Sequence, residues 1–375
     1  MASWVLFLLF SPVYIPLVIA MAIFMNAEKG NSAKKTLAMV LANLAFLFWG
    51  LYYFLSGDYE FYSRILMINV VSLLLVYPGI YIYIRQLIDP AVSFRQLIVH
   101  LVPAGIVALQ SLVYYLMLDA SEREQFVTVF RFAPEWGQPV MVFMFFCRII
   151  NILLLFAQIL FYGFRTISIL RQYSSEIQDV FSNTEGIQLN SIKVLNFVLF
   201  VGSIAAIGFY SINPVKVFGN YLVLILPLAV ISVAIWLFGI VGLRQHPLPE
   251  LPFVEKVRIE EPVEPGRRLF ENLNHYFDEQ KPYLNSELKI DDLIIELGTN
   301  RTHLSNAINQ YAGKNFNRFV NEYRIGFARE YISEHKAELT KDELAELSGF
   351  GSVRSFERNF KDCIGESFSQ FLEKV

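Results

Sequence analysis

Residues 339–371, which read LTKDELAELSGFGSVRSFERNFKDCIGESFSQF, have the pattern of a helix, a tight turn and a second helix. Thr340, followed three residues later by Glu343, is a capping box, which predicts the start of the first helix. Gly349 permits a sharp backbone turn, and Ser352 can cap the next helix. The residues therefore predict two helices held by a short, fixed turn.

The second of these helices has two distinct faces. Val353, Phe356 and Phe360 recur at helical spacing and are expected to face inward. A helix-turn-helix presents such a pair to the DNA major groove, with a polar face outward. A helical hairpin with a solvated charged side fits the spacing equally well. The outward face carries the basic residues Arg354, Arg358 and Lys361.

A second copy of the pattern precedes this one, over residues 288–311 (LKIDDLIIELGTNRTHLSNAINQY). Gly298 is at its turn, and Asn300 can cap the next helix. Asn and Arg side chains can make bidentate hydrogen bonds to base edges. Residues 316–329 are predicted to form one helix linking the copies. The outward face of the first copy carries Arg301, Thr302, Asn306 and Asn309.

Two such units joined by one helix resemble the AraC-type (AraC/XylS) DNA-binding domain. The resemblance covers residues 267–375, and it implies binding of double-stranded DNA in two successive segments of the major groove. Two positions depart from the family: Ile294 stands where a small Ala is usual, and Phe368 stands where a Pro is common. The residues that carry the resemblance are 298–305, 344–350 and 355–365, together with Tyr323, Arg324, Ile325 and Ala328.

Positions on the predicted recognition helices give the candidate DNA contacts. Six residues are expected at base edges, namely Arg301, Thr302, Asn306, Arg354, Ser355 and Arg358. Three are expected at phosphates, namely Lys314, Arg318 and Lys361. From Val263 onward, however, 15 Lys and Arg face 19 Asp and Glu, and phosphate contacts dominate DNA affinity. We therefore expect modest affinity from one copy, with a homodimer supplying the rest.

The first part of the chain has a different composition. The whole sequence is 55% hydrophobic with a mean hydropathy of +0.44, and the excess is confined to the first 245 residues. The predicted fold is all-α: a seven-helix transmembrane bundle, then a cytoplasmic domain with two helix-turn-helix units. Seven apolar segments are long enough to span the hydrocarbon core of a bilayer, near 4–25, 36–56, 64–84, 97–118, 139–164, 192–212 and 220–243.

Loop charges orient this predicted bundle. With the N-terminus outside, the inner loops carry eight Lys and Arg and the outer loops four, as the positive-inside rule favours. The C-terminal domain would then be cytoplasmic. Residues 77–103 and 180–189 resemble seven-helix membrane regions found ahead of AraC-type domains in some bacterial regulators. That resemblance implies the inner (cytoplasmic) membrane of a bacterium, with the lipid bilayer as a partner.

Three features of this region suggest further roles. Arg148 is a charge well inside a span and shares a face with Asn151, so the pair is a candidate site for a signal sensed at or outside the membrane. A structural bond to neighbouring polar groups is the alternative. Residues 119–138 form either a lid or an interfacial hairpin. The fifth helix is expected to continue into the inner loop 165–189, where it is a plausible contact for the DNA-binding domain.

The predicted domains are residues 1–244 for the transmembrane sensor or anchor, 245–266 for a proline-rich linker, and 267–375 for the DNA-binding domain. Two cysteines give no disulfide framework, and no phosphate loop, nucleophile elbow or zinc spacing is present. We expect no enzyme and no cofactor. The sequence favours a membrane-embedded one-component transcription regulator. The alternative is a transporter-like or lipid-binding protein whose tail is a protein-interaction module, and a sensor for a kinase pathway ranks lower.

Overall fold

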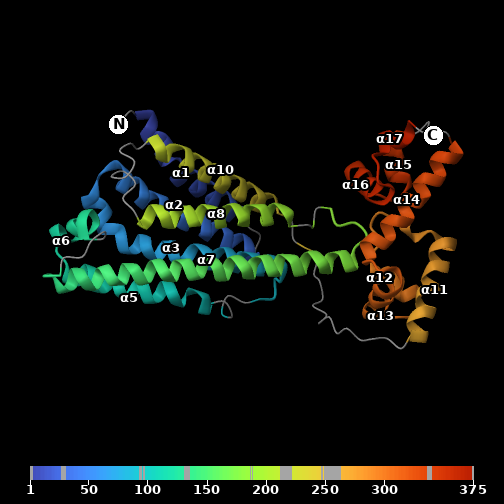
Figure 1. Cartoon of the computed structure of the whole chain (residues 1–375), viewed down its shortest axis with the longest axis horizontal. Helices are drawn as coiled ribbons and strands as arrows, with labels where there is room; N and C mark the ends of the chain where they lie inside the picture. The colour runs from blue at the N-terminus through green and yellow to red at the C-terminus, as the bar shows by residue number, and fades with distance from the viewer. Residues whose placement is uncertain are drawn as a thin grey trace. The chain divides into compact units, whose positions relative to one another are not determined.

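The computed structural model places most of the chain in helices that form two units (Figure 1). The first unit comprises Met1–Leu170 and Asn190–Leu248, and the second comprises Arg171–Leu189 and Pro249–Val375. The described part contains helices and no strand, which confirms the all-α prediction. Described residues are 3–26, 31–92, 95, 98–130, 136–185, 187, 189–211, 222–245, 248, 263–335 and 340–373.

Each of the seven predicted apolar segments overlaps a helix. The helices are α1 (Ser3–Met25), α2 (Ser32–Ser56), α3 (Tyr59–Ile88), η1 (Ile98–Leu101), α5 (Val102–Met117), α6 (Ala120–Gln125), η2 (Phe126–Phe130), α7 (Pro139–Val180), α8 (Asn190–Ser211) and α10 (Leu222–Arg244). The prediction that the fifth helix continues beyond its span is confirmed, because α7 runs to Val180 and its last ten residues belong to the second unit.

Four of these helical stretches are long and apolar enough to cross a membrane: Ser32–Ser56, Tyr59–Ile88, Ile98–Met117 and Pro139–Val180. Within the described residues, three other apolar helices are shorter, at Phe10–Met25, Asn190–Val201 and Ser232–Arg244. The structure therefore supports four candidate spans, and the predicted count of seven is not established by helix length and composition.

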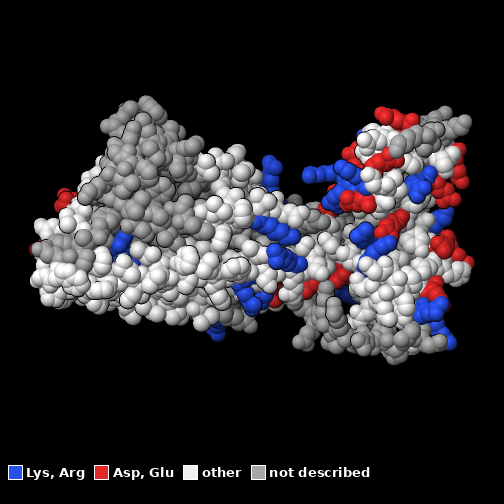
Figure 2. All heavy atoms as spheres, viewed as in Figure 1, with Lys and Arg blue, Asp and Glu red and all other residues white. Residues whose placement is uncertain are grey.

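The surface of the first unit is unusually apolar. Phe24, Leu116 and Phe164 are each 65% or more exposed, and the described surface is mostly free of charged groups (Figure 2). Soluble monomers rarely expose large contiguous apolar areas, so this surface is compatible with membrane anchoring.

Several polar groups inside the first unit pair with one another across helices. The Thr36 hydroxyl donates to Gln86 Oε1 at 2.6 Å, joining α2 to α3. The Tyr114 hydroxyl donates to the Ser63 carbonyl at 2.9 Å, joining α5 to α3. In lipid, unpaired polar groups are costly, so internal pairing of this kind suits helices surrounded by hydrocarbon.

The predicted outer loop is partly helical. Its helices α6 and η2 place Phe126 and Val127 in the core of the first unit, 1% and 0% exposed. The Phe126 ring lies 5.9 Å from that of Tyr114. These two residues thus pack into the bundle, while residues 131–135, which the lid and hairpin interpretations share, lie outside the described part.

The second unit has two apolar clusters that share one helix. Its helices are α11 (Val263–Gln280), η3 (Pro282–Leu284), α12 (Ile290–Glu296), α13 (Arg301–Ala307), η4 (Ile308–Ala312), α14 (Phe316–His335), α15 (Lys341–Leu347), α16 (Val353–Ile364) and α17 (Phe368–Leu372). The predicted linking helix is α14. Its Phe319 and Val320 pack with α11–α13, and its Ile325 and Ala328 pack with α15–α17. The helix thereby ties the two helix-turn-helix units into one domain.

Candidate nucleic-acid interface

Both predicted helix-turn-helix turns are formed as expected. Gly298 and Gly349 have positive φ values of 61° and 80°. The Asn300 side chain accepts from the His303 N–H at 2.9 Å at the start of α13. The Ser352 hydroxyl accepts from the Ser355 N–H at 3.1 Å at the start of α16. A Cβ at Gly349 would lie 2.4 Å from the Tyr283 carbonyl oxygen, so only glycine fits that turn.

In the first helix-turn-helix unit, which contains α12 and α13, the basic residue of the recognition helix α13 already has an ion-pair partner. The guanidinium of Arg301 makes a two-point contact with Asp291 of α12, with Nε to Oδ1 at 2.9 Å. The Arg301 side chain is 21% exposed. Thr302 is half-buried, and Asn306 Nδ2 is buried with no hydrogen-bond partner in the described residues.

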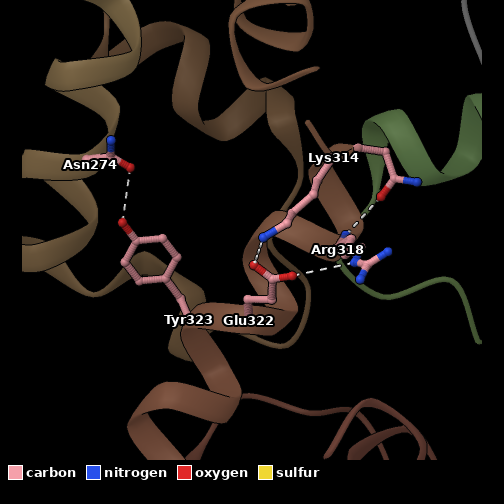
Figure 3. A network of polar contacts seen from close by, with 6 residues as sticks. Asn274, Lys314, Arg318, Glu322 and Tyr323 are labelled. Atoms are coloured by element: carbon pink, nitrogen blue, oxygen red, sulfur yellow. Dashed lines mark hydrogen bonds and ion pairs between the residues drawn. The ribbon is translucent and has the colours of Figure 1, made fainter. Parts of the chain in front are cut away.

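The two predicted phosphate contacts of the first unit share one carboxylate (Figure 3). Lys314 and Arg318 both form ion pairs with Glu322 of α14, the latter with Nε to Oε1 at 3.5 Å. Beside them, the Tyr323 hydroxyl donates to Asn274 of α11 at 3.0 Å. The structure thus brings these two cations together, and their charge is partly neutralised by Glu322.

In the second helix-turn-helix unit, which contains α15 and α16, the basic residues are exposed to solvent. Arg354, Arg358 and Lys361 of α16 are exposed, and none forms an ion pair with a described residue. Ser355 is different, because it is only 7% exposed and its hydroxyl lies 3.4 Å from Asn359 Nδ2. Ser355 therefore lies away from the outward face that the three cations share.

The packing of the second unit explains how α16 is held. Phe356 and Phe360 are fully buried, and Phe368, the residue that departs from the family pattern, is 3% exposed. The Phe356 and Phe368 rings lie 5.2 Å apart in an edge-on arrangement. An aromatic residue at position 368 therefore fills the core beneath the recognition helix.

Arg324 is a structural residue that the sequence interpretation left without a role. It is 1% exposed, and it donates to the carbonyls of Tyr283 and Asn285, both at 2.7 Å. Its guanidinium carbon lies 5.6 Å from the centre of the Phe350 ring. Burial lowers the pKa of Arg324 to about 10, which leaves it cationic at neutral pH. The sequence did indicate this burial, because Arg324 lies four residues from both Val320 and Ala328 on an apolar helix face.

In the structural unit made of Met1–Leu170 and Asn190–Leu248, three buried polar residues lie along α7. Arg148 and Asn151 are 7% and 5% exposed, and Gln158, which the sequence interpretation missed, is 5% exposed. Asn151 Oδ1 and both amide atoms of Gln158 have no hydrogen-bond partner among the described residues. Buried polar atoms are normally paired, so these groups have unused hydrogen-bonding capacity.

Comparison with known families identifies the C-terminal domain. Residues 293–374 match the family model of a helix-turn-helix domain. This domain is of the AraC type, a DNA-binding regulatory family and not an enzyme family. No curated protein and no solved structure matched the chain.

Proposed function

We propose that this chain is a membrane-embedded one-component transcription regulator that binds double-stranded DNA through both helix-turn-helix units. One observation carries the proposal: an AraC-type domain presents Arg354, Arg358 and Lys361 on the outward face of its second recognition helix without ion-pair partners in the described chain. Unpaired cations on that face suit contacts with phosphates and base edges. Arg301, Thr302 and Asn306 would supply contacts from the first unit, with Lys314 and Arg318 at phosphates.

Of the predicted base contacts, Ser355 has the weakest support. Its burial and its bond to Asn359 leave little of it to reach a base. We retain it only as a residue that orients Asn359 and the start of α16.

The proposed location is the inner membrane of a bacterium, with seven spans, the N-terminus outside and the DNA-binding domain in the cytoplasm. Four helices with sufficient length and hydropathy support membrane anchoring. With the N-terminus outside, the start of α2 and the ends of α3 and α10 would all face the cytoplasm. Cations lie at each of these ends: Lys34 and Lys35 at the start of α2, Arg85 near the end of α3 and Arg244 at the end of α10. These ends share one side of a bundle with that topology.

The proposed signal site is the polar stripe of α7. Ionisable residues inside a membrane span are rare and often functional, and Arg148 with Asn151 is joined there by Gln158. A signal with hydrogen-bonding groups, arriving at or outside the membrane, would pair the unused amide atoms. Binding would shift the population between conformations or between monomer and homodimer.

The direct test is crosslinked chromatin recovery in the native host, using the full-length protein tagged at its C-terminus. We expect a few sharply enriched sites that are lost when Arg354 and Arg358 are both replaced by Ala at equal protein level. The Lys314→Ala and Arg318→Ala pair serves as a comparison and should lose less of the enrichment, because Glu322 already offsets part of the charge of these two phosphate contacts. Flat recovery from a well-expressed protein would contradict the proposal.

A second candidate function is a transporter-like or lipid-binding protein whose tail is a protein-interaction module. The excess of acidic over basic residues from Val263 onward favours it. The two functions predict different DNA binding by the C-terminal domain, both in its salt dependence and in its preference among duplexes. DNA binding through phosphates weakens steeply as salt rises, whereas an interaction module would show no preference among duplexes at any salt concentration.

A further inference from the structure

The last residue of helix α7 and the five residues that follow it are built into the DNA-binding unit. We call Val180–Glu185 the docking segment. It belongs to the same structural unit as the DNA-binding domain, although the two lie far apart in sequence. Val180, Ser182 and Thr184 are 7%, 1% and 3% exposed. Val180 joins the apolar cluster formed by α11–α14. Alternate residues of the segment are thus buried, as in a strand that packs on a surface.

The backbone of the docking segment pairs with the chain just before α12. The Ser182 N–H donates to the Leu288 carbonyl at 3.1 Å, and Phe181 forms an antiparallel bridge with Lys289. The ammonium group of Lys289 lies 5.7 Å from the centre of the Phe181 ring. The segment therefore lies against the start of the first helix-turn-helix unit.

Side chains of the linking helix α14 hold the same segment. Asn317 Nδ2 donates to the carbonyls of Phe181 and Ser182, at 3.2 and 2.6 Å. The buried guanidinium of Arg324 donates to the Ser182 hydroxyl oxygen at 3.1 Å. Arg324 thus satisfies part of its hydrogen-bonding capacity only while the segment is docked.

The C-terminal end of the docking segment contacts the second helix-turn-helix unit. The Ser352 hydroxyl, which caps α16, donates to the Glu185 carboxylate. The Glu185 N–H donates to Asn183 Oδ1 at 3.0 Å. A Cβ at Gly351 would lie 2.3 Å from Asn183 Nδ2, so the Asn183 side chain fills the space beside this glycine. The segment consequently contacts the beginning of both helix-turn-helix units.

We propose that the docking segment is an autoinhibitory element, and that Glu185 and DNA exclude each other at the start of α16. This inference rests on the proposed DNA-binding function. In helix-turn-helix proteins the N-terminal residues of the recognition helix reach the base edges, and Ser hydroxyls commonly bond phosphates. Glu185 engages that hydroxyl and places a negative charge two residues from Arg354 along the path of a polyanion.

Regulation would follow from the continuity of the chain. The segment begins at the last residue of α7, the helix that carries Arg148 and Asn151. A change in α7 that favoured undocking would uncover Ser352 and remove the Glu185 carboxylate from the DNA-facing end of α16. The signal would then act by shifting a docked–undocked equilibrium, with no chemical step.

The first test is Glu185→Gln in the full-length chain reconstituted in lipid nanodiscs. Gln keeps an acceptor for the Ser352 hydroxyl and removes the charge, so the change isolates repulsion from positioning. We expect binding to a duplex recovered from chromatin to tighten by about fivefold. Glu176→Gln is the matched control, because Glu176 lies on α7 and bonds only Gln172 in the described structure. An unchanged or weaker affinity in Glu185→Gln would overturn autoinhibition.

The second test holds the segment in place. Asn183→Cys with Gly351→Cys, in a chain whose exposed Cys363 is replaced by Ser, should form a disulfide under mild oxidant. We expect the oxidised protein to bind the duplex at least about tenfold more weakly than the reduced protein, and each single-cysteine variant to be insensitive to oxidant. Two results would overturn autoinhibition while leaving the proposed DNA binding intact. One is a disulfide that forms without any difference in DNA affinity between the oxidised and reduced protein, and the other is failure of the disulfide to form. If the reduced protein bound no DNA at all, the proposed function itself would fail.

Discussion

The two helix-turn-helix units share their geometry and differ in the state of their charges. Both turn on a glycine of positive φ and both recognition helices begin at a capped residue. In the first unit every predicted cation is paired, with Asp291 or with Glu322. In the second unit the cations of α16 are exposed and without ion-pair partners in the described structure. The acidic net charge of the domain is therefore not evenly distributed, and attraction to phosphate is concentrated in the second unit.

The recognition helices also differ in the regularity of their backbone. The first, α13, spans Arg301–Ala307 and passes directly into the π-helical turn η4. The second, α16, has 12 residues and ends at Gly365, whose N–H donates to the Lys361 carbonyl at 2.8 Å. Together α13 and η4 cover the 12 residues Arg301–Ala312, and they also end at a left-handed glycine, Gly313, so the two stretches differ in the type of helix in their second half and not in length. From the exposed cations of α16 and the ion-paired cations of the first unit, we infer that the second unit provides most of the affinity and that the first adds selectivity.

The largest effect should come from removing the free cations. Replacing Arg354 and Arg358 together by Ala should weaken binding to a recovered duplex roughly a hundredfold and reduce the salt slope by about two. The pair Lys314→Ala and Arg318→Ala should cost less than about threefold, since breaking an existing ion pair offsets the loss of a phosphate contact. Fluorescence anisotropy at several salt concentrations measures both. Equal losses in the two pairs would remove the contrast between the units.

A gain of binding is expected when the first unit is freed. Glu322→Gln should release Lys314 and Arg318 together, and binding should tighten by about fivefold with a steeper salt slope. The control is Glu271→Gln, which releases Arg267 from an exposed pair on α11. Titration of both variants with the same duplex gives the comparison. A loss of affinity in Glu322→Gln would show that the ion pairs orient the first unit for binding.

The sequence predicts the parts of this domain that depend on near neighbours. The capping box of Thr340, the turn at Gly349 and the buried face of Phe356 and Phe360 follow from spacings of three or four residues. The ion pair of Arg301 with Asp291 crosses a turn and joins residues ten positions apart. No local periodicity predicts such a pair, and so the pairing of Arg301 in the first unit appeared only in the structure.

Longer-range features were less accessible still. The sequence suggested that the loop after the fifth helix contacts the DNA-binding domain, and Val180 and Phe181 do pack there. The bonds of Ser182 to Arg324 and of Glu185 to Ser352 join side chains more than a hundred residues apart, and no local spacing predicts such partners. Composition located the apolar segments, but whether each spans a membrane depends on the length of uninterrupted helix, which the structure supports for four of them.

A smaller change should alter selectivity within the first unit. Asp291→Asn weakens the hold on Arg301 and leaves its side chain able to reach a guanine edge, so overall affinity should rise by no more than about threefold. The informative readout is base preference, measured by selection from a randomised duplex. We expect stronger discrimination at the positions facing α13 and none of the change at those facing α16. An altered preference at the α16 positions would mean that the units are not independent readers.

The smallest effect concerns how each unit responds to acid. In the second unit, hydrogen bonds from the Thr340 N–H and hydroxyl lower the pKa of Glu343 below the ordinary value of a glutamate. Because the folded pKa is depressed, the stabilisation is complete above the ordinary carboxyl pKa and is lost as pH falls through the lowered value. The first unit has only half of this arrangement: Asp292 accepts from the Lys289 N–H at 2.8 Å, and a Lys side chain has no acceptor to return the bond.

Hydrogen exchange of the α15 amides, followed from neutral pH into the acid range, should therefore show protection that declines with protonation of Glu343. Glu343→Gln should flatten this decline in α15 and leave α12 unchanged. The effect should be slight, because Glu343 is exposed and the bonds compete with water. If α15 lost protection at the same pH in Glu343→Gln, the capping box would not be the acid-sensitive element, and the second unit would owe its stability chiefly to the aromatic core beneath α16.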